Sequence, residues 1–128
     1  MPEPLSQVAR IAAAQPGLQL LLLHGSRARG NAHTHSDWDF AYLAGPGFDP
    51  DALIARLAEA LHTDEVDLAD LARTSGLLRY KAASDGIAVY QQTPELFEQF
   101  RLDAISAWCE MAPVLGPAYA EQLGRLTA

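Results

Sequence analysis

Residues 25–39 of this 128-residue chain read GSRARGNAHTHSDWD and lie between two segments with the patterns of β-strands. The preceding run, LQLLLLH at residues 18–24, is short and almost continuously apolar, which is typical of a strand buried on both faces. Residues 37–43 alternate strictly, so their three aromatic side chains share one face, and Asp37 and Asp39 share the other. The segment predicts a strand, a polar loop with at most one helical turn, and a second strand.

The two aspartates of this segment predict a cation site. Successive rises of about 3.3 Å along a strand put the Cα atoms of Asp37 and Asp39 roughly 6 to 7 Å apart on one face. Mg²⁺ suits such a pair, because it takes one or two protein carboxylates and leaves other positions for water and substrate phosphate. An Asp-x-Asp motif alone is commonly a solvated strand start, so the prediction depends on the loop before it.

That loop has the residues of an anion-binding turn. Gly25 lets the backbone approach a phosphate without a Cβ in the way, and Ser26 adds a hydroxyl donor. Arg27 and Arg29 can add charge-assisted hydrogen bonds to the same oxygens, although Arg27 has the simpler alternative of pairing with an acid. The spacing of Gly25 and Gly30 imitates a P-loop, but the Lys-Ser/Thr pair of that motif does not follow.

A third carboxylate occurs in the next alternating segment, residues 65–71. Asp67 opens the order Asp, Ala, Leu at alternate positions, as Asp39 does in its own strand. If the two strands are neighbours, Asp67 stands beside the metal pair and accepts a proton from an attacking hydroxyl. Asp70 falls on the opposite face. The alternative is that Asp67 is a surface acid in an acidic run.

The histidines suggest structural roles. His33 and His35 lie in the loop without further nitrogen or sulfur ligands nearby, so we interpret them as loop residues. His24 ends the buried strand, and we expect it to be a hydrogen-bonded structural group rather than a catalyst.

The remaining pattern predicts one α+β domain over residues 1–128, with a small mixed sheet of about four strands flanked by helices. The last strand is expected at residues 87–91, and residues 114–128 are expected to hold a short helix that contacts a partner. Helices are expected over residues 5–14 and 75–84, and after a cap by Asp49 or Asp51 with apolar positions from Leu53 to Leu61. A last helix is expected to be capped by Thr93, to open with Pro94 and to bury one apolar stripe, which includes Trp108 and Met111, up to Pro113.

Composition excludes several classes of protein. The net charge is −7, the first 30 residues carry +2, and Lys81 is the only lysine, which argues against binding nucleic acid through its phosphates. The single Cys109 excludes a disulfide framework or a thiolate zinc site within one chain. The sequence has neither a leader pattern nor an 18-residue apolar span, so we expect a cytoplasmic protein without a membrane helix.

Taken together, these motifs resemble a known signature. Gly25-Ser26, ten residues, then Asp37-Trp38-Asp39 matches the GSx10DxD pattern of the polymerase-beta-like nucleotidyltransferase superfamily. The segments GSRARG, SDWDFAY, VDLADL and SGLLRYKAASDGIAVY resemble more narrowly its minimal nucleotidyltransferase branch, the MntA-type antitoxins that pair with HepT-type HEPN ribonuclease toxins. The resemblance covers residues 18–112.

The resemblance implies roles for the residues that match it. Gly25 and Ser26 hold the nucleotide phosphates, with Arg27 and Arg29 in the same nucleotide-binding motif. The catalytic acids, which also bind two Mg²⁺ ions, are Asp37, Asp39 and Asp67.

The implied activity is transfer of AMP from ATP, with Mg²⁺, to a tyrosine hydroxyl of a cognate HEPN ribonuclease toxin, which is thereby neutralised. The chain leaves little sequence for an acceptor pocket of its own, so we expect the acceptor on a docked partner. Two alternatives stay open. One is a non-catalytic antitoxin that only covers the toxin, and the other is a nucleotidyltransferase that acts on a small molecule.

Overall fold

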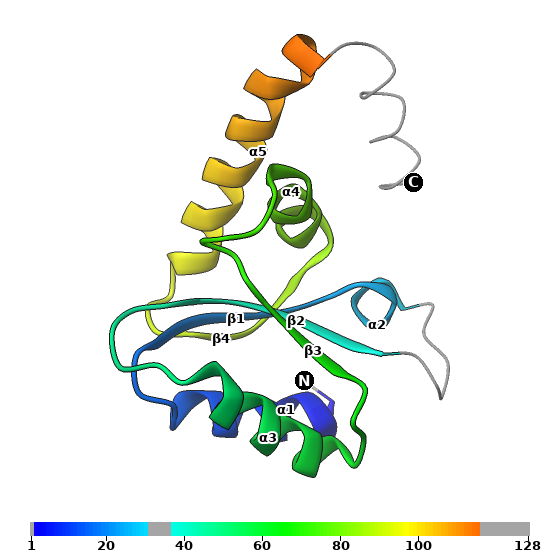
Figure 1. The fold of residues 1–128 in the computed structure, drawn as a ribbon, viewed down its shortest axis with the longest axis vertical. Coiled ribbons are helices and arrows are strands. Elements are labelled where there is room, and N and C mark those ends of the chain that lie inside the picture. The colour runs from blue at the N-terminus through cyan, green and yellow to red at the C-terminus, as the bar shows by residue number, and fades with distance from the viewer. Residues whose placement is uncertain (1, 31–36, 116–128) are drawn as a thin grey trace.

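The computed structural model describes residues 2–30 and 37–115, which form a four-stranded sheet between two layers of helices (Figure 1). The strands are β1 (Leu18–His24), β2 (Trp38–Ala44), β3 (Val66–Asp70) and β4 (Ile87–Gln91), in the order β3-β2-β1-β4. β1 is antiparallel to β2 and β4, whereas β2 and β3 are parallel. The prediction of a small mixed sheet of four strands is confirmed.

Helices cover both faces of the sheet. Figure 1 shows α1 (Glu3–Ala13) and α3 (Pro50–Leu61) below it, and α4 (Gly76–Asp85) and α5 (Leu96–Leu115) above it. The single turn of α2 (Ser26–Arg29) lies at one end of the sheet, between β1 and β2. The four helices and the turn predicted from sequence are all present.

The face under α1 and α3 buries the aromatic side of β2. Phe40 is fully buried and Tyr42 nearly so, against Leu53 and Leu57 of α3, which follow the 3.6-residue period of an amphipathic helix. Of the two predicted caps of α3, the structure selects Asp49, whose side chain accepts hydrogen bonds from the first backbone amides of the helix.

The opposite face packs against α4 and α5. Alanine and leucine side chains and one phenylalanine fill this layer, namely Leu20, Leu22, Ala41, Leu71, Ala82, Ala83, Phe100 and Ala104. Because strand side chains alternate, His24 shares this face with Leu22, and Asp39 shares it with Ala41. The polar residues therefore continue the α4–α5 face beyond the end of its apolar core.

The start of α5 differs from the prediction that Thr93 caps it and Pro94 opens it. The helix begins at Leu96, after a turn. The side-chain oxygen of Gln91, at the end of β4, accepts a hydrogen bond of 3.1 Å from the Phe97 amide. A cap from the preceding strand replaces the local cap, so the helix starts two residues later.

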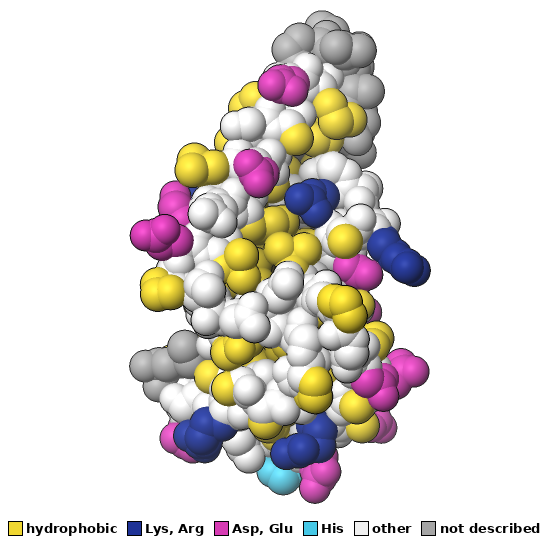
Figure 2. Space-filling model, turned by 90° about the vertical axis from the view of Figure 1, so that its left-hand side faces the viewer, with side chains coloured by type: hydrophobic (Ala, Val, Ile, Leu, Met, Phe, Trp, Pro, Cys, Tyr) yellow, Lys and Arg dark blue, Asp and Glu magenta, His cyan; other side chains and the backbone are white. Residues whose placement is uncertain are grey.

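The far end of α5 extends beyond the sheet and past Pro113, where its predicted apolar stripe had ended. Trp108 is still buried, but Met111, predicted on the same buried stripe, is 45% exposed. Figure 2 shows acidic side chains along this helix and hydrophobic ones where it meets the sheet.

Two further predictions fall outside the described residues, namely the loop histidines His33 and His35 and most of the helix expected over residues 114–128. Among the described helices, none is both long and apolar enough to cross a membrane.

Candidate active site

Two of the predicted acids stand side by side. Asp39 of β2 pairs with Asp67 of the parallel strand β3, and on its other side with His24 of β1. Paired residues on adjacent strands point to the same face, so three polar side chains share one face at this end of the sheet. The expectation that Asp67 lies beside Asp39 is confirmed.

Asp70 lies on the opposite face, as predicted, and has a structural role there. It pairs with Tyr42, and burial together with the hydrogen bond to Asp70 raises the pKa of the Tyr42 hydroxyl. The Ala72 amide donates to the Asp70 carboxylate at 2.9 Å, and Arg73 lies 3.8 Å from it. Asp70 therefore fixes the end of β3.

Gly25 brings the loop against the Asp39 carboxylate. Its backbone has φ 76° and ψ −159°, a conformation that essentially only glycine adopts. A Cβ built on Gly25 would lie 2.5 Å from Oδ2 of Asp39, closer than side-chain atoms can approach. The backbone conformation therefore favours glycine at this position, and any larger residue would displace the Asp39 carboxylate.

The turn after Gly25 is short and closed at both ends. The amides of Ala28 and Arg29 both donate to the Gly25 carbonyl at 3.1 Å, and the amide of Gly30, at φ 80°, donates back to Ser26. The first amides of a helix have no partner within it and attract anions. Ser26 is therefore presented at the start of a turn beside Asp39.

The two arginines of this turn make contacts within the protein. The Arg27 guanidinium lies over the Trp38 ring, 4.1 Å from its centroid, which is a cation–π geometry. Arg29 lies 3.8 Å from the carboxylate of Asp85, the last residue of α4. The ion pair of Arg29 with Asp85 connects α2 to α4.

Asp37 precedes β2 rather than lying in it. The strand starts at Trp38, whose amide donates to the Glu65 carbonyl at 2.8 Å, because pairing with the β3 segment begins there. The prediction that both aspartates lie on one strand therefore holds for Asp39 alone. Asp37 instead borders a pocket of about 90 Å³ at the start of β2 and β3, whose lining is Asp37, Asp64, Glu65, Val66 and Asp67.

The chemistry of these donors fits a hard cation. Asp39, Asp67 and Asp37 offer only carboxylate oxygens, which Mg²⁺ prefers. Within the described residues, no three acidic, histidine or cysteine side chains lie close enough together to form a metal-binding cluster. Like charges repel one another unless a cation lies between them, so separated carboxylates are the arrangement that electrostatics favours here.

His24 lies at the end of β1, as predicted, but its position beside Asp39 was not predicted. Burial lowers the pKa of its imidazole, and the nearby carboxylates of Asp39 and Asp67 oppose that shift only in part. The ring donates to the Phe40 carbonyl, as expected of a structural histidine, but its buried Nε2 has no hydrogen-bond partner among the described residues. The sequence did contain a signal for this position. His24 lies two residues after Leu22, so strand alternation places both side chains on the same face.

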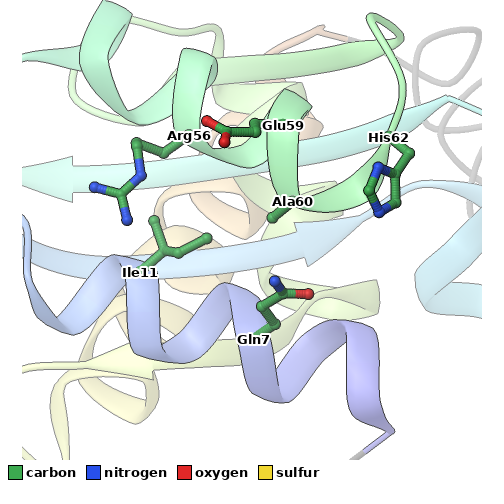
Figure 3. A pocket seen from close by; sticks show the side chains of 6 residues that line it. All are labelled: Gln7, Ile11, Arg56, Glu59, Ala60 and His62. Atoms are coloured by element: carbon green, nitrogen blue, oxygen red, sulfur yellow. The ribbon is translucent and has the colours of Figure 1, made fainter.

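A second pocket, of about 320 Å³, lies between α1 and α3 (Figure 3). Its lining is Gln7, Ile11, Arg56, Glu59, Ala60 and His62. These helices cover the other face of the sheet from Asp39 and Asp67, so the pocket is separate from the acidic site.

Comparison with known proteins agrees with this geometry. The sequence matches the family "Polymerase beta, Nucleotidyltransferase" over residues 6–95, which include the glycine turn and all three acids. The protein adenylyltransferase MntA of Aphanizomenon flos-aquae is 30% identical in an alignment of 104 residues that covers 72% of this chain and 69% of the relative.

Solved structures extend the similarity to most of the chain. A chain of a toxin–antitoxin crystal structure with AMP-PNP superposes with a TM-score of 0.71 at 29% identity, covering 87% of this chain and 94% of its own. A chain of the complex between tri-AMPylated Shewanella oneidensis HEPN toxin and MNT antitoxin gives a TM-score of 0.64 at 28% identity, covering 88% and 92%. The chain therefore belongs to the polymerase beta nucleotidyltransferase family, as a minimal nucleotidyltransferase of the MntA type.

Proposed function

We propose that this protein is a magnesium-dependent adenylyltransferase that moves AMP from ATP to a tyrosine hydroxyl of a HEPN ribonuclease toxin and thereby neutralises it. The MntA relative is a protein adenylyltransferase, and the structural relatives include a complex with AMP-PNP and one with an AMPylated HEPN toxin. Each of these properties belongs to the relatives, and the shared site is the reason to extend them to this chain.

The observation that carries the proposal is the register of the sheet. It sets Asp39 and Asp67 side by side, with Gly25 in contact with the Asp39 carboxylate. A phosphate bound at the turn and a cation bound at the acids would then be neighbours, which is the arrangement that phosphoryl transfer needs.

The residues that would hold Mg²⁺ are Asp37, Asp39 and Asp67, with two ions as the natural number for this chemistry. When bound, Mg²⁺ activates the attacking hydroxyl and neutralises charge on the phosphates.

The chain's own groups bind, orient and move a proton. Gly25 and Ser26 hold the phosphates through the turn, flanked by Arg27 and Arg29. The tyrosine oxygen forms a bond to the α-phosphorus, and the bond from that phosphorus to the bridging oxygen of the β-phosphate breaks. Pyrophosphate leaves with the electron pair, and the hydroxyl proton passes to the Asp67 carboxylate.

The partner's chemistry also suits this surface. The protein carries a net charge of −7, and acidic side chains line α5 (Figure 2). Complementary charge steers association, so an RNA-binding toxin with a basic surface is favoured as the partner.

The experiment is incubation of the purified protein with ATP, Mg²⁺ and a co-encoded HEPN protein, followed by intact mass measurement. We expect AMP on a tyrosine of the partner and loss of its ribonuclease activity. In the variant with Asp37→Asn and Asp39→Asn we expect binding of the partner at low salt without transfer. If that variant protects cells as well as the wild type, the protein acts by binding alone.

Asp67 and Asp70 provide a matched pair of variants on one strand. Asp67→Asn should reduce transfer by roughly 10²- to 10⁴-fold, the usual effect of losing a positioned base. Asp70→Asn should leave transfer near the wild-type rate, because Asp70 lies on the other face. The proposal fails if the co-encoded protein is never modified while free sugars or drugs accept AMP.

A further inference from the structure

We propose that Lys81 of α4 binds the β- and γ-phosphates of ATP, an inference that rests on the proposed function. Lys81 is the only lysine in the chain and does not belong to the glycine turn or to the acidic motif. Its place in the fold assigns it to the same site.

The packing of α4 sets the direction of Lys81. Ala82 and Ala83 are fully buried against Leu20 and Leu22, so α4 lies directly over the face of the sheet that bears the site. Lys81 is half-buried at the margin of this contact.

The ion pair of Asp85 marks which side of α4 faces the glycine turn. Asp85 reaches Arg29 at 3.8 Å. Lys81 lies four residues earlier, one helical turn away on the same side of the helix. The stripe of α4 that borders α2 therefore carries Lys81.

The packing of α4 on β1 gives a second sign of proximity. Ala82, the residue after Lys81, lies in one buried cluster with Leu22, and His24 is two residues further along β1 on the same face. His24 pairs with Asp39 across β1 and β2. Lys81 thus lies on the side of the acids as well as on the side of the turn.

The negative charge of the site favours a cation that can bind the phosphates of ATP. The acids of the site and of its neighbouring pocket are negative, and a nucleoside triphosphate adds about four further negative charges. Of the cations nearby, Arg27 contacts the Trp38 ring and Arg29 is paired with Asp85. Lys81 makes no ion pair with any residue in the described part of the chain. A flexible ammonium group of this kind is a common ligand of phosphate.

The test compares ATP with AMP, in the presence of Mg²⁺, by calorimetry on the intact protein. Lys81→Met should weaken ATP binding roughly 10- to 100-fold, as expected for loss of a hydrogen bond between charged groups. AMP binding should change by less than about twofold, because AMP lacks the β- and γ-phosphates. Lys81→Arg should restore most of the affinity for ATP.

Arg56→Met is the matched control, since it removes a cation from the other face of the sheet and should leave ATP affinity unchanged. If Lys81→Met does not fold, protection of the wild type replaces it: Mg²⁺ and ATP should slow acetylation of Lys81, located by peptide mass, at least about fivefold, and AMP should not.

Three results would overturn the inference: unchanged ATP affinity in Lys81→Met, equal loss for ATP and AMP, or acetylation that ATP does not slow. These outcomes are distinct from failure of the proposed function. If only the proposed function fails, the wild type still binds ATP and Lys81→Met still weakens that binding, but no AMP is transferred to the partner.

Discussion

Replacement of Gly25 by alanine tests the contact on which the site depends. The backbone at Gly25 has φ 76° and ψ −159°, and holding any other residue there costs about 1 to 3 kcal/mol. In a domain of this size, 1 kcal/mol corresponds to roughly 3 to 6 °C in Tm, so Gly25→Ala should lower Tm by roughly 3 to 18 °C.

The second effect of Gly25→Ala falls on the chemistry. The new Cβ would lie 2.5 Å from Oδ2 of Asp39, so this flexible carboxylate must move. A displacement of about 1 Å in a catalytic group typically costs on the order of 10²-fold in rate. We therefore expect AMP transfer, measured well below the Tm of the variant, to fall about 10²-fold.

Gly47→Ala separates backbone strain from contact with the acid. Gly47 has φ 90°, and no heavy atom lies within 4 Å of a Cβ built on it. This variant should lose stability through strain but transfer AMP at the wild-type rate. The reasoning is refuted if Gly25→Ala keeps the wild-type Tm, or if its loss of transfer is no greater than that of Gly47→Ala.

Three further predictions concern neighbours of the site. Burial lowers the pKa of His24 below its reference of 6.5, so the unfolded chain takes up a proton more readily than the folded protein. The stability that His24 contributes in its neutral form is therefore complete above about pH 6.5 and is lost as the pH falls below that value. His24→Gln should therefore reduce the decrease in Tm between about pH 7.5 and 5.5, and an unchanged decrease would contradict the assignment. In a double-mutant cycle, Asp70→Asn and Tyr42→Phe should show a coupling of about 0.5 to 1.5 kcal/mol in urea unfolding, and additive losses would exclude their hydrogen bond. Asp85→Asn releases a partly exposed Arg29, so it should change stability by less than about 1 kcal/mol and leave ATP binding at least as tight as in the wild type; weaker binding in calorimetry would show that the ion pair itself is needed.

The sequence by itself determined the elements and the register of the acids. The apolar run of β1 and the alternation of β2 and β3 are local patterns, and they set which residues share a face. The order Asp, Ala, Leu from Asp39 and again from Asp67 gave the alignment of the two strands on the condition that they are neighbours, because a shift by one residue would reverse every side chain. The start of α3 was narrowed to a cap by Asp49 or Asp51, because such a cap bonds amides only two and three residues away.

Only the tertiary structure decided what lies against these acids. The periodicity of α4 shows which of its residues share a side, but it does not show which element that side faces. The pairing of Asp85 with Arg29 and the position of Lys81 near His24 therefore depended on the packing of α4 over β1. The start of α5 was decided by Gln91, a residue of another element. Such contacts depend on distances between elements, and local sequence patterns carry no information about those distances until the chain has folded.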